Sequence, residues 1–301
     1  MRKEEIELDE NSYDLYMESL NYSTVKTNEV IGNTFESPYI TYQDISYIPN
    51  TNSSYSVYSK GKIVAYAEIK LFNFETNQHS PYKQPFGLIV LDIEFKNKRI
   101  NDYLVKRMQE DYQDNTEGFL ILANPILINA QQLSNLYPVK ELLPTKHIRA
   151  TNAVTVVDKL NLDSDLHLKL FENYAQYWLT NKKIAISPYG LELYYTFLYS
   201  ELGLKDNIYY FPELSAIAIA KHIGRTLYLY DVFSIVEIDL DIVIKSLSNI
   251  FTNQVVLGFS PKTEGYTYTE YKKSALTLFA PPELVTLIEK NHLMLPILSH
   301  L

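Results

Sequence analysis

The stretch GLIVLDIEFKNKRINDYL, residues 87–104, contains a change of hydrophobic period that indicates a strand followed directly by a helix. Its first part is a nearly continuous apolar run that predicts a buried strand, made of Leu88, Ile89, Val90, Leu91 and Ile93. Its second part has apolar residues at helical spacing, namely Ile100, Tyr103, Leu104 and, just beyond, Met108. A short basic turn, residues 96–99, joins the two.

This turn has the charge and the position of an anion-binding corner. It consists of Lys96, Asn97, Lys98 and Arg99. The first turn of a helix leaves backbone N–H groups without partners, and the helix dipole favours negative charge there. The sequence therefore predicts a place to hold a phosphate group. The alternative is an ordinary strand-to-helix connection whose basic side chains are simply solvated.

Composition excludes several classes of function. The chain has 301 residues, enough for two domains, and a net charge of −9, which argues against nucleic acid as a partner. It has no cysteine, which excludes disulfides and thiolate chemistry, and its nine glycines provide no Gly-rich nucleotide cradle. Six scattered histidines show no metal-ligand spacing, so no metal is expected. We see neither a membrane-spanning run nor a signal peptide and expect a cytoplasmic protein.

In the first half the pattern predicts an α/β unit around the opening stretch. Weak periodicity suggests a helix at residues 10–20 and a strand at 40–48, and alternation around Gly61 predicts a hairpin over residues 55–71. A helix at residues 100–113 and a buried strand at 119–123 then read as a crossover onto a parallel neighbour. A helix at 129–137 and a closing strand at 150–157 complete the unit.

The second half is expected to repeat this order after a polar boundary at residues 158–165. A helix is predicted with Leu166, Leu170, Tyr174 and Trp178 on its apolar face, and another begins at residues 187–188. A hairpin over residues 214–233, a helix capped by Asp239 with Phe251 inward, and strands at 255–259 and 275–279 follow. An edge strand is expected at 266–273. The predicted domains are residues 1–158 and 164–301.

The opening stretch resembles the acyl-CoA-binding segment of the GNAT superfamily of N-acetyltransferases, in which a loop Arg/Gln-x-x-Gly-x-Gly/Ala follows the strand. Lys96 takes the first basic position, whereas Arg99 and Asn101 replace the two small residues, so both glycines are missing. Residues 129–137 are similar to the family's Asn-x-x-Ala-x-x-x-Tyr element, with a slip of one residue. The segments at residues 211–234, 255–262 and 275–283 also look like C-terminal parts of bacterial GNAT-type proteins.

The resemblance implies two GNAT-like α/β domains in tandem, each with a mixed, mostly antiparallel central sheet flanked by helices. It implies acetyl-CoA as cofactor, transfer of an acyl group to the primary amine of a small molecule or peptide, and Tyr137 as general acid. The residues it implies for cofactor binding are the backbone of Leu91 and Ile93 together with Lys96, Asn97, Lys98, Arg99, Ile100 and Asn101.

Two carboxylates are candidates for the general base. Asp92 and Glu94 alternate with buried side chains of the central strand and so face the same side of the sheet, where partial desolvation would raise the pKa of a carboxyl group. They could equally be the polar face of a half-covered strand. In the second half Glu213 and Asp231 hold comparable hairpin positions, but no basic turn follows them. The rival interpretation is a degenerate fold that serves as a binding or interaction module, for which a homodimer is one form.

Overall fold

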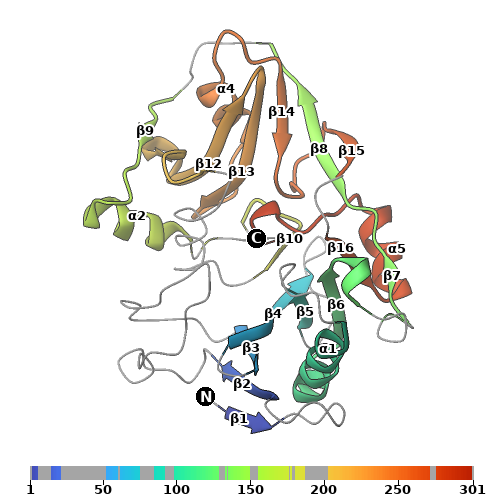
Figure 1. Cartoon of the computed structure of the whole chain (residues 1–301). Helices are drawn as coiled ribbons and strands as arrows, with labels where there is room; N and C mark the ends of the chain where they lie inside the picture. Colours follow the sequence, from blue (N-terminus) through green and yellow to red (C-terminus); the bar gives the residue numbers. More distant parts are fainter. Residues whose placement is uncertain are drawn as a thin grey trace.

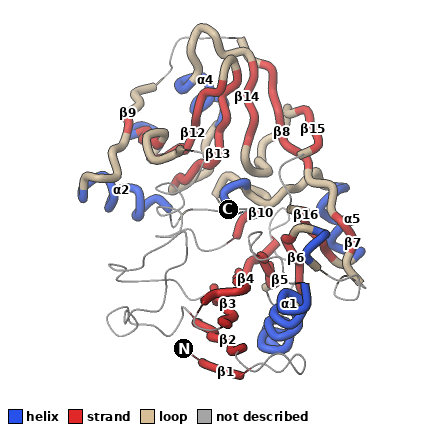
Figure 2. The backbone as a smooth tube through the Cα atoms, in the orientation of Figure 1, coloured by secondary structure: helices blue, strands red, loops and turns tan. Residues whose placement is uncertain are grey.

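The computed structural model describes residues 2–5, 15–21, 52–59, 62–74, 85–91, 98–128, 133, 135–149, 155–175, 177, 180–186, 203–271 and 276–299. Within these residues the chain forms two mixed, mainly antiparallel sheets flanked by helices (Figure 1). Figure 2 shows the two groups of strands, one in the lower and one in the upper part of the view. The expected α/β class, with two such sheets, is confirmed.

The first sheet is built around the strand of the opening stretch. Its order is β1 (Arg2–Glu5), β2 (Leu15–Asn21), β3 (Asn52–Ser59), β4 (Lys62–Phe74), β5 (Phe86–Leu91), β6 (Gly118–Ala123), β16 (Thr277–Ala280) and β7 (Tyr137–Pro138), and β10 (Ile184–Ile186) pairs with β4. Among the described strands of this sheet, only the pair β5·β6 is parallel. Helix α1 (Lys98–Tyr112) makes the crossover between these two strands, and the 3₁₀ turns η1 (Gln113–Asn115) and η2 (Pro125–Leu127) flank β6.

The second sheet repeats this arrangement. Its order is β15 (Thr267–Glu270), β8 (Leu142–His147), β14 (Gln254–Leu257), β13 (Thr226–Ser234), β12 (Ala216–Ile223), β11 (Ile208–Phe211) and β9 (Asp158–Lys159). Again one pair, β13·β14, is parallel, with helix α4 (Leu240–Leu247) as its crossover. The other helices are α2 (Asp165–Ala175), α5 (Pro282–Lys290), η3 (Pro212–Leu214) and η4 (Ile297–Ser299).

Each half of the chain gives a strand to the sheet of the other half. The strand β8 precedes the expected boundary at residue 158 but pairs with β14 in the second sheet, whereas β16, near the C-terminus, pairs with β6 in the first. The orders β4·β5·β6·β16·β7 and β12·β13·β14·β8·β15 then correspond strand by strand, with the same sequence of antiparallel and parallel pairs. Figure 1 shows this exchange by colour, since green β8 lies beside orange β14 and red β16 beside green β6.

The apolar run of the opening stretch forms the centre of the first core. Strand β5 is buried because α1 lies across one face and a second cluster, containing residues of β16 and α5, lies against the other. Ile100, Leu104, Val105 and Met108 all lie on the buried side of α1, as their spacing requires. Burying one such side chain contributes about 2 kcal/mol, so this stripe fixes the helix on the sheet.

Several expected elements are confirmed. The hairpin β3·β4, helix α1, the parallel strand β6, the hairpin β12·β13 and the edge strand β15 all form where the sequence predicts them. Asp239 does cap α4, since its carboxylate accepts the backbone N–H of Asp241 at 2.9 Å. The predicted domains, residues 1–158 and 164–301, stay a prediction. Any division into domains must take account of β8 and β16, which pair with strands of the other half.

Other expectations are wrong. Residues 15–21 form a strand rather than a helix, because pairing with β3 outweighs a weak helical period. Tyr137 lies in the short strand β7 and not at a helix end. Residues 155–157 belong to no strand. Leu166 and Phe251, expected inward, are 73% and 64% exposed, because α2 packs through Phe171 and Tyr174 and α4 ends before residue 251. The expected strand at 40–48, the helix from 187 and the side chain of Trp178 lie outside the described residues.

Candidate functional site

The carboxyl ends of the parallel strands β5 and β6 bound the candidate site. The described parallel ladder runs from Phe86 beside Gly118 to Val90 beside Leu122. One residue further along each strand, Leu91 has its partner in β4 and Ala123 has its partner in β16. The crevice beyond the carboxyl ends of parallel strands is where α/β sheets bind ligands most often.

The first turn of α1 lies near the segment that follows β6, through the contact of Asn101 with Leu127, and it carries two cations. Lys98 and Arg99 are exposed, and the first turn of this 15-residue helix has no acidic residue. Positive side chains at a helix N-terminus oppose the helix dipole, at a cost of about 0.3–1 kcal/mol each. An anion bound there would interact favourably with the helix dipole and with both cations, and it would accept hydrogen bonds from the backbone N–H groups of the turn. The donor set therefore fits a phosphate or diphosphate.

Asn101 joins the two borders of the crevice. Its side chain is 1% exposed, and its Nδ2 donates to the backbone oxygen of Leu127, in η2 beyond β6, at 3.2 Å. Ile100 beside it is buried in the first core. Two of the residues implied for cofactor binding therefore lie in the interior, where Asn101 holds the start of α1 against the segment that follows β6.

The other predicted site residues are placed only in part. Leu91 is 2% exposed and ends β5, as expected for a residue that would contribute backbone. The residues between β5 and α1 lie outside the described residues, and these include Asp92, Ile93, Glu94, Lys96 and Asn97. Their roles as base and cofactor ligands stay predictions.

Tyr137 lies apart from the end of β5. It is 54% exposed in β7, and the sheet order places β6 and β16 between β7 and β5, a separation of three strand spacings or about 14 Å. Its register partner Ala280 is also further along β16 from the carboxyl end of β6 than Thr277 is. The structure therefore does not bring Tyr137 next to the described part of the crevice, and its role as general acid stays a prediction.

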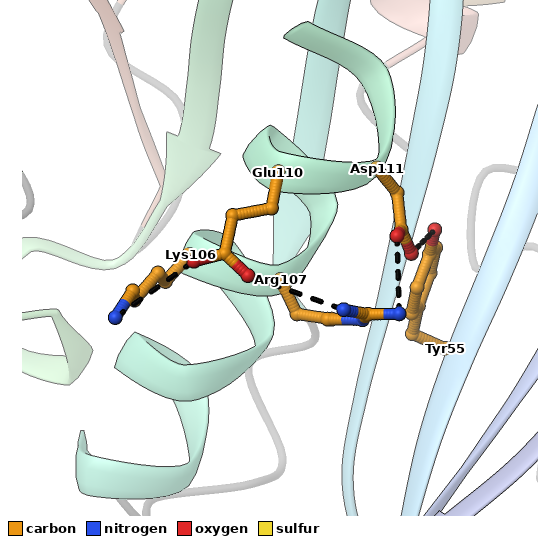
Figure 3. Close-up of polar contacts among 5 residues, drawn as sticks. All are labelled: Tyr55, Lys106, Arg107, Glu110 and Asp111. Carbon is orange, nitrogen blue, oxygen red and sulfur yellow. Dashed lines mark hydrogen bonds and ion pairs between the residues drawn. The ribbon is translucent and has the colours of Figure 1, made fainter.

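A polar cluster at the other end of α1 could not be foreseen from spacing alone (Figure 3). The Tyr55 hydroxyl, on β3, donates to Asp111 Oδ2 at 3.0 Å, and Arg107 Nη2 lies 3.1 Å from Asp111 Oδ1. Arg107 and Lys106 also approach Glu110, at 4.0 and 3.8 Å. Burial, together with the negative charge of Asp111, raises the pKa of Tyr55 above its ordinary value. A raised pKa keeps the Tyr55 hydroxyl protonated, so that it can hold α1 on β3 through its hydrogen bond to Asp111.

The carboxylates singled out in the second half have different surroundings. Asp231 is fully buried and forms an ion pair with Lys182. Glu213 accepts a hydrogen bond from the hydroxyl of Thr155 at the surface. Across the described residues no group of three or more histidines, aspartates or glutamates could hold a metal ion. None of the described helices has the length and apolar character needed to cross a bilayer.

Several solved structures match the chain at low sequence identity. Eis1 from Mycobacterium abscessus matches with 10% identity and a TM-score of 0.43, over 75% of this chain and 64% of that one. GCN5-related N-acetyltransferases from Kribbella flavida and Anabaena variabilis match with 10% and 11% identity and TM-scores of 0.42 and 0.41. Each covers 75% of this chain, and the matches span 58% and 62% of those chains.

The chain therefore spans less than two thirds of the length of these structures. No protein-family model and no curated protein matches the sequence. A hairpin, a buried strand, a crossover helix and a parallel strand follow one another in each half, as the resemblance implies. The expected architecture of two mixed, mainly antiparallel sheets flanked by helices is confirmed, and its assignment to the GNAT superfamily stays a prediction.

Proposed function

We propose that the chain is a cytoplasmic N-acyltransferase that uses acetyl-CoA to acylate a primary amine of a small molecule or peptide. The observation that carries this proposal is the pair of exposed cations, Lys98 and Arg99, in an acid-free first turn of α1 at the carboxyl ends of β5 and β6. Such a corner suits the diphosphate of CoA. The likeness to acetyltransferases in the order of elements supports the choice of reaction.

Each part of the chain would have a definite task. The N–H groups at the start of α1, with Lys98 and Arg99, would bind the diphosphate. The extended pantetheine arm would pair with the backbone at Leu91 and Ile93, as an added strand does. Bound acetyl-CoA supplies the activated acyl group. Asp92 or Glu94 would take a proton from the attacking amine, and an acid, for which Tyr137 is the candidate, would return one to the departing thiolate. Asn101 positions the helix.

Isothermal titration with acetyl-CoA tests the proposal. The double variant Lys98→Glu, Arg99→Glu reverses both charges, and glutamate in a first helical turn favours the helix, so the fold should persist. Two charge-assisted hydrogen bonds are each worth about 1.5–3 kcal/mol, so binding should weaken at least a hundredfold. The matched control is Lys106→Glu, further along the same helix, which should bind as the parent does. Absence of heat and of a thermal shift at millimolar acetyl-CoA would remove the proposal.

The rival function is a binding or interaction module without catalysis. It is favoured by Arg99 and Asn101, whose side chains occupy the helical turn where the resemblance expects glycine. Release of free thiol from acetyl-CoA, measured with a panel of primary amines, separates the two. Binding of acetyl-CoA without release of CoA thiol in the presence of any of the amines would support the module.

A further inference from the structure

The second sheet has a crevice at the place that corresponds to the candidate site of the first. The parallel ladder β13·β14 ends with Leu229 beside Leu257, after which Gly258 still donates its N–H to the oxygen of Leu229 at 2.8 Å. A Cβ at Gly258 would lie 2.8 Å from the oxygen of Tyr230, so the backbones are in close contact there. Beyond this point the segments that follow the two strands are joined through a third piece of chain.

That third piece is residues 181–183. Lys182 forms an antiparallel bridge with Pro261, and Lys183 donates its N–H to the oxygen of Ser260 at 2.9 Å, so the piece lies along the segment after β14. On its other side Asn181 Nδ2 donates to Ser234 Oγ, at the end of β13, at 2.6 Å. The piece therefore lies between the parted strands and fills their crevice.

The side chain of Lys182 occupies the interior of this crevice. It is fully buried and forms an ion pair with Asp231, which is also fully buried and lies two residues beyond the end of the parallel ladder. The ring centroids of Phe233 and Phe259 are 4.8 and 5.7 Å from Lys182 Nζ. A carboxylate and two aromatic rings are the groups that stabilise an ammonium ion away from water.

Asp231 contacts the ammonium group of Lys182 through one carboxylate oxygen. Its Oδ1 accepts the N–H of Val232 at 2.6 Å in addition to the ion pair, while its Oδ2 has no hydrogen-bond partner among the described residues. Burial raises the pKa of Asp231 and lowers that of Lys182, and contact between the two groups opposes both shifts. Each group therefore needs the other in order to stay charged.

The same piece of chain also reaches the first sheet. It continues directly into β10, which pairs with β4, and Ile184 is buried in the core beneath the first sheet. Lys182 is therefore fixed from both sides, and the crevice is closed by a segment that cannot withdraw without breaking strand pairing in the first sheet.

We propose that the crevice between β13 and β14 is a binding site for a primary ammonium group that the chain fills with its own Lys182, so that the second sheet is closed there to an external ligand. The inference does not depend on acyl transfer by the first sheet. It assigns the two halves different roles, with an anion-binding corner in the first and an internally occupied cation site in the second.

Amine labelling of the native protein tests whether the site is filled. A reagent that acylates lysine amines, added to the folded protein, should modify Lys183, which is partly exposed, and leave Lys182 unmodified. Both lysines should react in denaturant. Peptide mass spectrometry reads the two positions from the same sample. Labelling of Lys182 at the rate of Lys183 in the folded protein would overturn the proposal.

Chemical rescue tests what the site binds. Lys182→Ala removes three carbons and the amine, which propylammonium replaces. Loss of a buried pair should lower the melting temperature by roughly 6–10 °C, and added propylammonium should restore at least half of this loss at ionic strength held constant. Lys183→Ala is the matched control and should show neither effect. A Lys182→Ala, Asp231→Asn variant should lose the rescue.

Two results would refute the cation site. One is equal stabilisation of the parent and of Lys182→Ala by propylammonium. The other is equal rescue by tetramethylammonium, which has no N–H to donate to Asp231. If Lys182→Ala does not fold, the labelling experiment on the native chain decides alone.

Discussion

The substitution Leu278→Ala tests the exchange of strands most directly, because it changes a residue near the C-terminus and should destabilise the sheet near the N-terminus. Leu278 is 2% exposed on β16, lies opposite Leu122 of β6 and packs into the core beneath the first sheet. Buried Leu→Ala substitutions cost 2–5 kcal/mol, and we take about 3 kcal/mol. Amide exchange governed by opening of the first sheet should then accelerate roughly a hundredfold.

Hydrogen exchange read by mass spectrometry gives the assay, with peptides from β5 and β6 compared with peptides from β12 and β13. The matched control is Leu229→Ala, another fully buried leucine in the C-terminal half, which packs into the core of the second sheet. Leu278→Ala should act first on β5 and β6, and Leu229→Ala on β12 and β13. If both variants lowered protection in the second sheet alone, the exchange of strands would be refuted.

Two of the three further predictions concern single hydrogen bonds, and the third concerns the titration of a histidine. Tyr55→Phe removes the donor to Asp111 and should lower the free energy of unfolding by about 1 kcal/mol in urea titrations, whereas no loss would remove its assigned role. Asn101→Leu leaves the oxygen of Leu127 without this donor and should cost about 1–3 kcal/mol, and an unchanged urea midpoint would contradict it. Burial lowers the pKa of His222, so the unfolded chain binds more protons, and stability should fall as the pH drops through 6.5. His222→Gln should flatten that pH profile, and an equally steep one would contradict the assignment.

The sequence predicted the parts of the fold that depend on neighbouring residues. The change of period at the basic turn marks both β5 and α1, and the Gly-containing turn marks the hairpin β3·β4, because these signals act within a few residues. The strand at residues 277–280 was also predicted, but its sheet was not. The local sequence of a four-residue strand does not specify which sheet it joins, and long-range packing makes the choice.

The candidate site divides in the same way. Lys98 and Arg99 were predicted as an exposed basic corner and the structure places them so. The inward position of Asn101 was not predicted, because its partner oxygen is 26 residues away. Lys182 gave no signal at all, since lysine is almost never fully buried unless it is paired, and its partner Asp231 lies 49 positions further along the chain.

The exchanged strand β16 also supports one border of the crevice at the carboxyl ends of β5 and β6. One border, β5, is fixed by β4 of the same half, but the other border, β6, has β16 as its outer neighbour, with Ala123 opposite Thr277. The segment after β6 is in turn tied to α1 through Asn101. The position of β6 relative to β5 therefore depends on the C-terminal half of the chain. A second half whose own crevice is filled by Lys182, as we propose, is suited to this supporting role, because it can be rigid there.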